Sequence, residues 1–289
     1  MYPILFELGP FVISSFGLMM VMAFLICNYF LKKDIETDGF DPIIGEDITF
    51  RAAIGGIIGA KLYYLIETIP TGQAADNISG LKDIISGIFI LFAGIFTFSG
   101  DRIAHSSSQI GAGIQNFGAG LVFLGGLMGG MLAVTIYIHR NQLKWLQVAD
   151  WVAPFLALGH GIGRVGCFLV GDDYGLPSNL PWACAFPNGL PPTDIPVHPT
   201  QLYEMGAYFS VFIYLRYRKR NQYITGELMF EYLFLVGFSR FMVEFIRINP
   251  KYLLGLSGAQ YISIFMMLVG LYYMYTMHNK DNGLSKTIG

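Results

Sequence analysis

The chain has 289 residues, of which 54% are hydrophobic and 13% are charged, and its formal net charge is -2. An average soluble domain has about 25% charged residues, so this composition indicates an integral membrane protein. The weak net charge, with no long basic run, excludes the clustered positive surface that is typical of nucleic-acid binding. The three cysteines are too few for a disulfide framework and do not have the spacing of a zinc site.

Seven apolar runs are long enough to cross a membrane, which takes about 20 largely apolar residues. In chain order they are Phe11–Leu31, Ile48–Ile66, Phe117–Ile138, Val148–Val170, Pro199–Tyr217, Leu228–Ile246 and Ala259–Met277. No internal repeat is evident. We therefore expect an all-α integral membrane protein with seven transmembrane helices, which form one multi-pass domain over residues 1–289.

Basic residues in short loops predict the orientation of these spans, because such residues favour the cytoplasm. Three basic clusters stand out, at Lys32–Lys33, His139–Lys144 and Arg216–Arg220. Seven spans place all three clusters inside the cell. This predicts that the N-terminus and the loop at 172–197 lie outside and that the C-terminus is cytoplasmic.

A shorter apolar run, Ile84–Phe98, follows the second predicted span. A single crossing by this run would send the later basic clusters outside, against the rule for basic loops. We therefore expect it to be an interfacial or re-entrant element in an outer-side insert at residues 68–116. Within this insert, Ser106–Gln115 is rich in glycine, serine and glutamine and is predicted to be loop.

Glycines four residues apart recur in the second and third predicted spans. Gly55 with Gly59 predicts a close approach of two helix backbones. Gly125 and Gly126 are followed four residues later by Gly129 and Gly130. For Gly125 and Gly126 the sequence leaves two interpretations open. They provide either close packing or room for a substrate.

The stretch from Gly159 to Gly175 continues the fourth apolar run, yet it carries an imidazole, a guanidinium and a thiol, followed by two carboxylates. These groups belong to His160, Arg164, Cys167, Asp172 and Asp173. A charged side chain near the centre of a bilayer is costly and is normally kept only beside a cavity or a partner. We therefore expect the chemistry of the protein to centre on this stretch.

Four basic residues are expected in the outer half of the spans under the predicted topology. They are Lys61, Arg164, Arg240 and Arg247. Arg240, Glu244 and Arg247 have the spacing of one helix face, where Glu244 can neutralise one arginine. With Glu204 as the second acid, this cluster still keeps an excess of positive charge. Arginine binds phosphate through two parallel hydrogen bonds, so the pattern predicts a site for a phospholipid head group.

Several groups of this region admit more than one interpretation. His160 lies one helical turn before Arg164 and is either a structural histidine with one partner or a catalytic base. Cys167 is expected to be a small buried hydrophobe, with a reactive thiol as the alternative. The paired aspartates that follow form a solvated cap, a brace for Arg164 or, together with His198, a weak metal site that no ligand spacing supports. We predict no metal and no cofactor.

A set of ordered motifs resembles the bacterial prolipoprotein diacylglyceryl transferases. The strongest are Gly161-Ile162-Gly163-Arg164-Val165-Gly166, with Phe168 and Gly171 to Gly175 behind it, and His198-Pro199-Thr200-Gln201-Leu202-Tyr203-Glu204. Supporting pieces are Phe16 to Met19, Gly125 to Gly129, Val148 to Asp150, Ala153-Pro154, Arg240, Val243 to Phe245 and Arg247. The resemblance covers most of the chain apart from the insert at 68–116.

The resemblance implies a reaction and a location. Members of that family move the diacylglyceryl group of phosphatidylglycerol to the thiol of the lipobox cysteine in a preprolipoprotein and release glycerol phosphate. The implied site faces the outer side of the bacterial plasma (inner) membrane, with phosphatidylglycerol, a preprolipoprotein signal peptide and membrane lipids as partners. Two alternatives stay open: a lipid-dependent transferase with a different acceptor, and a catalytically silent phospholipid-binding membrane protein.

Matched by position, the resemblance gives roles to particular residues of this chain. The essential arginines correspond to Arg164 and Arg240, the signature glycines to Gly163 and Gly175, and the framework of the site to His198, Gln201 and Glu204. Arg247 and Lys61 are expected to add positive charge for the substrate.

Four family positions differ in this chain. The histidine before the Gly-Gly pair is Leu124, the tyrosine of the first span is Phe16, the asparagine after the first arginine is Cys167, and the tyrosine before the second arginine is Val236. The identity of the base is therefore left open, with His160 and His198 as the candidates.

Overall fold

The computed structural model describes residues 3–8, 11–97, 99–118, 122–221 and 223–288. Over these residues the chain is mainly helical, with nine α-helices and two short two-stranded sheets. Five helical stretches there are long and apolar enough to cross a membrane. They are Ser15–Thr37, Ile43–Thr71, Gln73–Phe96, Phe123–Arg140 and Trp145–Val170. The expectation of a helical membrane protein is confirmed at this level, while the seven spans and their orientation stay predictions.

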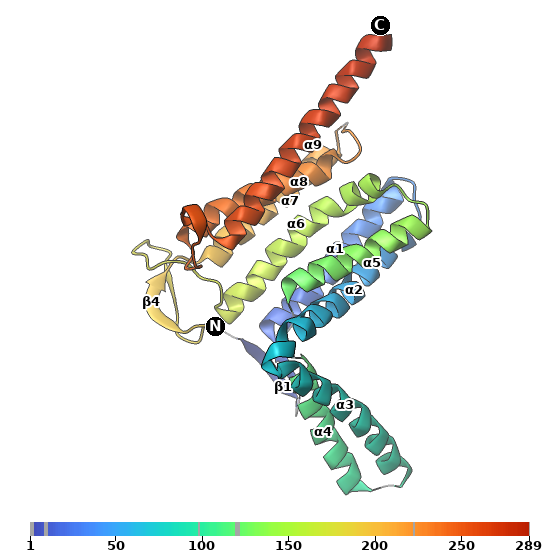
Figure 1. The fold of residues 1–289 in the computed structure, drawn as a ribbon, viewed down its shortest axis with the longest axis vertical. Coiled ribbons are helices and arrows are strands. Elements are labelled where there is room, and N and C mark those ends of the chain that lie inside the picture. Colours follow the sequence, from blue (N-terminus) through green and yellow to red (C-terminus); the bar gives the residue numbers. More distant parts are fainter. Residues whose placement is uncertain (1–2, 9–10, 98, 119–121, 222, 289) are drawn as a thin grey trace. The chain divides into compact units, whose positions relative to one another are not determined.

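The chain divides into two compact units, and the candidate site lies in the first, which comprises Met1–Leu5, Ser14–Glu46 and Gln142–Gly289. Its helices are α1 (Ser15–Thr37), α6 (Trp145–Val170), α7 (Thr200–Lys219), α8 (Glu227–Val243) and α9 (Gly258–Ile288). α6 packs against α1, α7 and α8, α7 also packs against α8, and α8 packs against α9 (Figure 1). The helices that carry the candidate site therefore meet at α6.

The core of this unit forms where small residues of α6 face larger residues of α7 and α8. Ala153 and Ala157 on α6 are fully buried in one cluster with Tyr208 and Leu215 of α7 and Tyr232 of α8. Small side chains let helices approach closely, so these alanines bring α7 and α8 near to α6. The polar groups on neighbouring turns of the same helices are thereby brought together.

The segment after α6 folds into a small structure of its own. Gly171 ends the helix in the left-handed conformation, with φ 78°, which glycine adopts without strain. The chain then forms β3 (Cys184–Phe186) and β4 (Thr193–Val197), which pair antiparallel. Tyr174 stacks on Phe186 with ring centroids 5.3 Å apart. The predicted outer loop is thus an ordered segment that can hold side chains in place over the end of α6.

The second unit comprises Phe6–Ile13 and Asp47–Asn141. It contains most of α2 (Ile43–Thr68), a 3-10 turn at Ile69–Thr71, α3 (Gln73–Phe96), α4 (Gly100–Gly118) and α5 (Phe123–Arg140). β1 (Ile4–Leu8) and β2 (Phe11–Ser14) form a separate two-stranded sheet near the start of the chain.

Glycines make the contact between α2 and α5. A Cβ atom on Gly59 would lie 2.7 Å from the Gly129 Cα, and one on Gly55 would lie equally close to the Gly129 carbonyl oxygen. The predicted close packing of these helices is confirmed, and it includes Gly125, which faces the Gly59 backbone. Gly126 has more space, because its Cβ would lie 3.3 Å from the nearest atom.

The outer-side insert differs from its prediction. Ser106–Gln115, expected to be loop, lies inside α4, and α4 packs along α3 as a helical hairpin (Figure 1). A Cβ atom on Gly113 would lie 2.9 Å from the Ile84 backbone nitrogen, so only glycine fits there. The Ser106 hydroxyl donates to the Ile103 carbonyl at 2.8 Å. The loop prediction was wrong because glycine and serine here serve helix packing, with the hydroxyl satisfied inside the helix.

Three helix boundaries also differ. The first span begins at Ser15, not Phe11, because the Ser14 hydroxyl caps the helix by accepting the Gly17 N–H at 3.0 Å. The run expected at Ile84–Phe98 is the second half of α3, whose 24 residues can cross a membrane, and residue 98 lies outside the described residues. The third predicted span, Phe117–Ile138, corresponds to α5, which starts at Phe123. Residues 119–121 of that prediction lie outside the described residues.

Candidate active site

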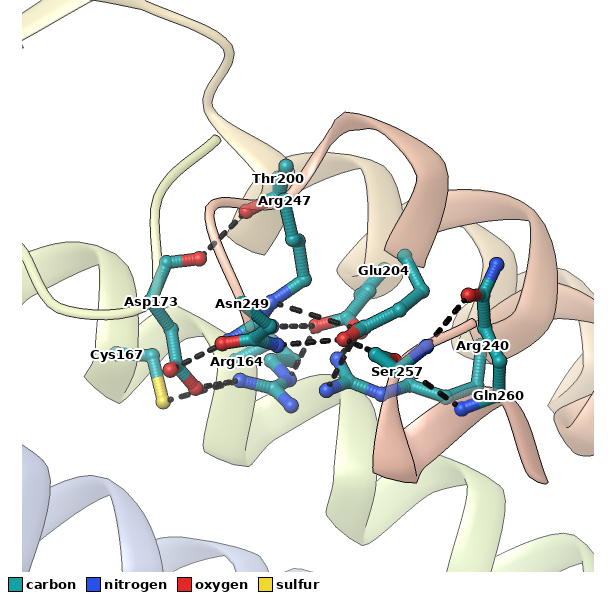
Figure 2. A network of polar contacts seen from close by, with 11 residues as sticks. Arg164, Cys167, Asp173, Thr200, Glu204, Arg240, Arg247, Asn249, Ser257 and Gln260 are labelled. Atoms are coloured by element: carbon teal, nitrogen blue, oxygen red, sulfur yellow. Dashed lines mark hydrogen bonds and ion pairs between the residues drawn. The ribbon is translucent and has the colours of Figure 1, made fainter. Parts of the chain in front are cut away.

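A buried carboxylate on α7 draws three arginines together (Figure 2). Glu204 is fully buried, and its Oε2 lies 2.6 Å from Arg164 Nε and 3.6 Å from Arg247 Nη1. Its other oxygen, Oε1, pairs with Arg240 Nη1. A charge buried to this extent needs partners. The ion pairs therefore fix guanidinium groups that come from the end of α6, from α8 and from the chain after α8.

A second buried carboxylate, Glu244, supports the same network. Its Oε2 lies 3.0 Å from Arg240 Nη2 and 3.7 Å from Arg247 Nε. Its Oε1 accepts hydrogen bonds from Ser257 Oγ at 2.8 Å and from Asn249 Nδ2 at 2.6 Å. The expectation that Glu244 neutralises an arginine is confirmed.

The expectation that Arg240, Glu244 and Arg247 share one helix is wrong. α8 ends at Val243, a single 3-10 turn follows, and Arg247 has extended backbone with φ -89° and ψ 157°. Pro250 has no N–H with which to continue the helix by donating to the Ile246 carbonyl. The Leu176 N–H, in the segment after α6, donates to this carbonyl instead, at 2.8 Å.

Asp173, in the segment after α6, is a third carboxylate of this network. Its Oδ2 lies 2.9 Å from Arg164 Nη1, and its Oδ1 pairs with Arg247 Nη2. Thr200 Oγ1 donates to the Asp173 backbone carbonyl at 2.6 Å, and Gln201 Nε2 donates to the carbonyl of Asp172. Of the interpretations left open for the two aspartates, these contacts support the brace for Arg164.

Asp173 changes the charge expected for the site. The network now contains the guanidinium groups of Arg164, Arg240 and Arg247 and the carboxylates of Asp173, Glu204 and Glu244. The predicted excess of positive charge is therefore absent from this network. The prediction failed because it counted only charges inside the spans and left out an aspartate just beyond one.

Lys61, the fourth predicted cation, belongs to the second unit. It is buried there, and its Nζ pairs with Asn77 Oδ1 at the start of α3. Because Asn77 is part of the insert, this contact ties α3 to α2. The expected contribution of Lys61 to substrate binding stays a prediction.

The two aspartates titrate differently although they are adjacent. Burial raises the pKa of Asp172, and the neighbouring Asp173 charge adds to this effect. Burial also works to raise the pKa of Asp173, but the Arg247 and Arg164 guanidinium groups outweigh it and hold that pKa below its ordinary value. Asp173 therefore stays ionised as a partner of both arginines.

The geometry does not favour a metal site at these residues. Cys167, Asp172 and Asp173 place possible ligand atoms within 4.8 Å of one another. Arg164 Nη1, however, lies 3.6 Å from Cys167 Sγ and contacts Asp173. A cation there would be repelled by the fixed guanidinium charge. Among the described residues, His198 is not part of this group.

His160 lies among tyrosines of α7 and α8. Its Nδ1 is 3.3 Å from the Tyr232 hydroxyl, and its ring centroid is 5.3 Å from that of Tyr208. Among the described residues, no hydrogen bond or ion pair joins His160 to the arginine network. Tyr208 lies one helical turn after Glu204 on much the same face of α7.

His198 belongs to a chain of hydrogen bonds in the segment before α7. Trp182 Nε1 donates to the Tyr203 hydroxyl at 2.7 Å, and this hydroxyl lies 3.2 Å from His198 Nδ1. An indole N–H can only donate, so the Tyr203 hydroxyl accepts it. The direction of the hydrogen bond between this hydroxyl and Nδ1 depends on the tautomer of His198.

The two predicted signature glycines have different surroundings. A Cβ atom on Gly175 would lie 2.8 Å from Thr200 Cγ2 and 2.9 Å from His198 Cβ, so the segment could not pass α7 with any larger residue. A Cβ atom on Gly163 would meet only Met20 Sδ, at 3.9 Å. Gly175 is thus required by packing, whereas a Cβ atom on Gly163 would make only an ordinary van der Waals contact.

The four positions that differ from the family pattern are dispersed. Cys167 is buried beside Arg164, and Val236 lies in the core cluster of α6, α7 and α8. Phe16 on α1 packs where α6 carries Gly166, whose Cβ would lie 3.1 Å from the Phe16 ring. Leu124 is on α5 in the second unit. Of the four, Cys167 directly contacts the arginine network.

The sequence contained a signal for one part of the network that was missed. Ser257 and Gln260 form a capping box at the start of α9: the Ser257 N–H donates to Gln260 Oε1 at 3.0 Å, and the Gln260 N–H donates to Ser257 Oγ at 3.3 Å. The serine hydroxyl also donates to Glu244. The S-x-x-Q pattern predicts the cap but not its second contact with a distant carboxylate.

Comparison with known proteins agrees with the motifs. A family model described as prolipoprotein diacylglyceryl transferase matches residues 3–276. The phosphatidylglycerol-prolipoprotein diacylglyceryl transferase of Clostridium tetani is 31% identical over 278 residues, which cover 94% of this chain and 96% of that protein. The protein of the same name from Aliivibrio salmonicida is 30% identical over 280 residues, 94% of this chain and 86% of that protein. The chain therefore belongs to the prolipoprotein diacylglyceryl transferase family.

Proposed function

We propose that this chain transfers the diacylglyceryl group of phosphatidylglycerol to the thiol of a lipobox cysteine in a preprolipoprotein. The acceptor sulfur attacks the glyceryl carbon that is bonded to phosphate. A carbon–sulfur bond forms, the carbon–oxygen bond breaks, and glycerol phosphate leaves with the electron pair. The thiol proton passes to a base or to the departing phosphate, so the reaction balances without a cofactor.

The observation that carries this proposal is the pair of arginines held by one buried acid. Glu204 is 0% exposed, while the Arg164 and Arg240 side chains are 19% and 21% exposed. Each guanidinium has five N–H donors, so neither is exhausted by its carboxylate partners. Donors that are fixed before the reaction stabilise negative charge as it develops on a leaving group. Arg164 and Arg240 are therefore assigned to the phosphate.

The hydrogen bonds of the two histidines support different roles in the reaction. If Tyr203 donates to His198 Nδ1, His198 Nε2 carries a hydrogen and is a donor to substrate. If His160 Nδ1 donates to the Tyr232 hydroxyl, its Nε2 keeps a lone pair and can accept a proton. We assign the base to His160, which is worth about 10² to 10⁴ in rate. Arginines near an acceptor thiol also favour its thiolate.

The remaining predicted residues receive supporting roles. Gly163 keeps the helix surface small beside Arg164, while Gly175 and Gln201 hold the segment after α6 in place. Arg247 contributes the third guanidinium of the network. The protein is a multi-pass membrane protein by its apolar helices and its family. We place it in the bacterial inner membrane with the site toward the outer face, as its basic loops predict.

The proposal is tested in bacterial cells depleted of their own diacylglyceryl transferase. Expression of this chain is expected to restore lipid modification of a reporter preprolipoprotein, detected as a mass increase at its lipobox cysteine. A reporter with serine at that position controls for the acceptor. Restored modification of some other thiol or amine, with the reporter unchanged, would show a transferase with a different acceptor. No modified product, despite binding of phosphatidylglycerol, would show a lipid-binding protein.

A further inference from the structure

Asp173 differs from the other two carboxylates of the arginine network in its exposure. Its side chain is 45% exposed, while those of Glu204 and Glu244 are 0% exposed. It still pairs with two guanidinium groups, those of Arg164 and Arg247 (Figure 2). Within this network, Asp173 is thus the carboxylate that a molecule from outside can reach.

The backbone of Asp173 is held more firmly than its side chain. Its carbonyl accepts from Thr200 Oγ1 at 2.6 Å, and the preceding carbonyl accepts from Gln201. Both donors are fully buried residues of α7. The carboxylate is 45% exposed, while its partners Arg164 and Arg247 are 19% and 3% exposed, so solvent reaches these ion pairs from the Asp173 side. Rotation of the side chain can therefore break both ion pairs without moving the chain.

While Asp173 stays bound the network is neutral, so an added anion would give it a net negative charge. The three guanidinium groups already face three carboxylates, of which two are buried and cannot leave. A phosphodiester carries one negative charge and accepts paired hydrogen bonds from arginine, as a carboxylate does. The exchange of one for the other keeps the network neutral.

We propose that Asp173 occupies the anion position of the arginine site and swings away when the phosphodiester head group of a lipid binds. Asp173 thus competes with the lipid and sets the affinity of the site for it. This inference rests on the proposed function, because it takes the lipid head group to be the ligand of Arg164. It adds a residue that no family motif indicated.

The test measures lipid affinity with matched charge-neutralising variants. Asp173→Asn removes the competing charge, and asparagine keeps the shape and tolerates the positive φ of 61° at this position. Asp194→Asn removes one charge from the same segment, at an exposed position of β4. Each purified protein is titrated with phosphatidylglycerol and, separately, with diacylglycerol, which lacks the phosphodiester, and bound lipid is counted by native mass spectrometry.

We expect Asp173→Asn to bind phosphatidylglycerol roughly two- to tenfold more tightly than the wild type, with the affinity for diacylglycerol unchanged. Asp194→Asn is expected to match the wild type for both lipids. Asp173→Glu restores a carboxylate and is expected to bind phosphatidylglycerol as the wild type does. Unchanged or weaker phosphatidylglycerol binding by Asp173→Asn would overturn the inference, as would an equal gain for both lipids.

The result is separable from the fate of the proposed function. Lipid binding is measured without an acceptor, so a gain in Asp173→Asn stands even if no variant transfers a diacylglyceryl group. Transfer by the wild type together with no gain in Asp173→Asn would reject the inference alone. Thermal melts of each variant show whether it is folded. If Asp173→Asn melts early, the test uses Asp173→Glu, and a gain in phosphatidylglycerol affinity by this variant would reject the inference.

Discussion

The two signature glycines make opposite predictions for the same substitution. Gly175→Ala places a methyl group within 2.9 Å of His198 Cβ and Thr200 Cγ2, and we expect it to destabilise the protein by about 1–3 kcal/mol. Gly163→Ala meets only Met20 Sδ at 3.9 Å and is expected to fold normally. Melting temperatures of the two variants in detergent check this difference. If Gly163→Ala melted as early as Gly175→Ala, the described surroundings would be wrong.

Asp173 makes the stability of the site dependent on pH. Arg247 and Arg164 outweigh the effect of burial and hold the Asp173 pKa below its ordinary value. Such a carboxyl stabilises the folded state above its unfolded pKa, about 3.9, and loses that contribution as pH falls through the lower folded value. We expect the wild type to melt above Asp173→Asn near neutral pH and the gap to narrow below about pH 4. A gap that widens on acidification would contradict this.

Single residues of the site could be predicted to different extents. Arg164, Glu204 and Arg240 were identified because charges within apolar runs are rare and need partners. The contact between Asp173 and Arg247 could not be predicted from the sequence, because it depends on how the segment after α6 folds back on the chain after α8. That fold rests on backbone hydrogen bonds such as Leu176 to Ile246, which no side-chain pattern reports.

At the scale of the elements, the packing of α3 against α4 can be tested with a matched pair of glycine substitutions. A Cβ atom on Gly113 would lie 2.9 Å from the Ile84 backbone nitrogen, while one on Gly100, at the start of α4, would meet nothing within 4 Å. We therefore expect Gly113→Ala to loosen the hairpin and Gly100→Ala to leave it intact. Limited proteolysis, followed by mapping of cuts within residues 68–116, checks this. Equal protection of both variants would show that the glycine does not make the contact.

Element types were easier to predict than element ends. Apolar runs of about 20 residues identify helices because a helix of that length can cross the hydrocarbon core of a membrane. The end of α8 and the helix over Ser106–Gln115 were missed for related reasons. The Ile246 carbonyl, just after α8, bonds to the segment after α6, and α4 packs a glycine surface against α3. Local composition does not report these contacts with partner segments.

At the scale of the whole molecule, the predicted topology assigns each of three residue positions to one side of the membrane. In a variant with alanine at Cys27, Cys167 and Cys184, single cysteines replace Gly100, Lys144 or Ser178. We expect an impermeant maleimide to label Gly100→Cys and Ser178→Cys in intact cells. Lys144→Cys is expected to react only after permeabilisation, because basic loops stay in the cytoplasm. Labelling of Lys144→Cys in intact cells, or protection of Gly100→Cys, would reject the seven-span arrangement.

The central claim is that guanidinium groups fixed by Glu204 stabilise the departing phosphate. Arg164 contacts Glu204 through Nε and Asp173 through Nη1 at the same time, which a lysine cannot reproduce. The purified protein is incubated with phosphatidylglycerol and a lipobox peptide, and glycerol phosphate and lipidated peptide are followed by mass spectrometry. Asp194→Asn serves as the control, and melting curves verify folding.

We predict that the wild type and Asp194→Asn release glycerol phosphate in step with lipidated peptide, and that Arg164→Lys is slower by about 10²-fold or more. Release at the wild-type rate by a folded Arg164→Lys variant would contradict the account, as would the absence of release by the wild type.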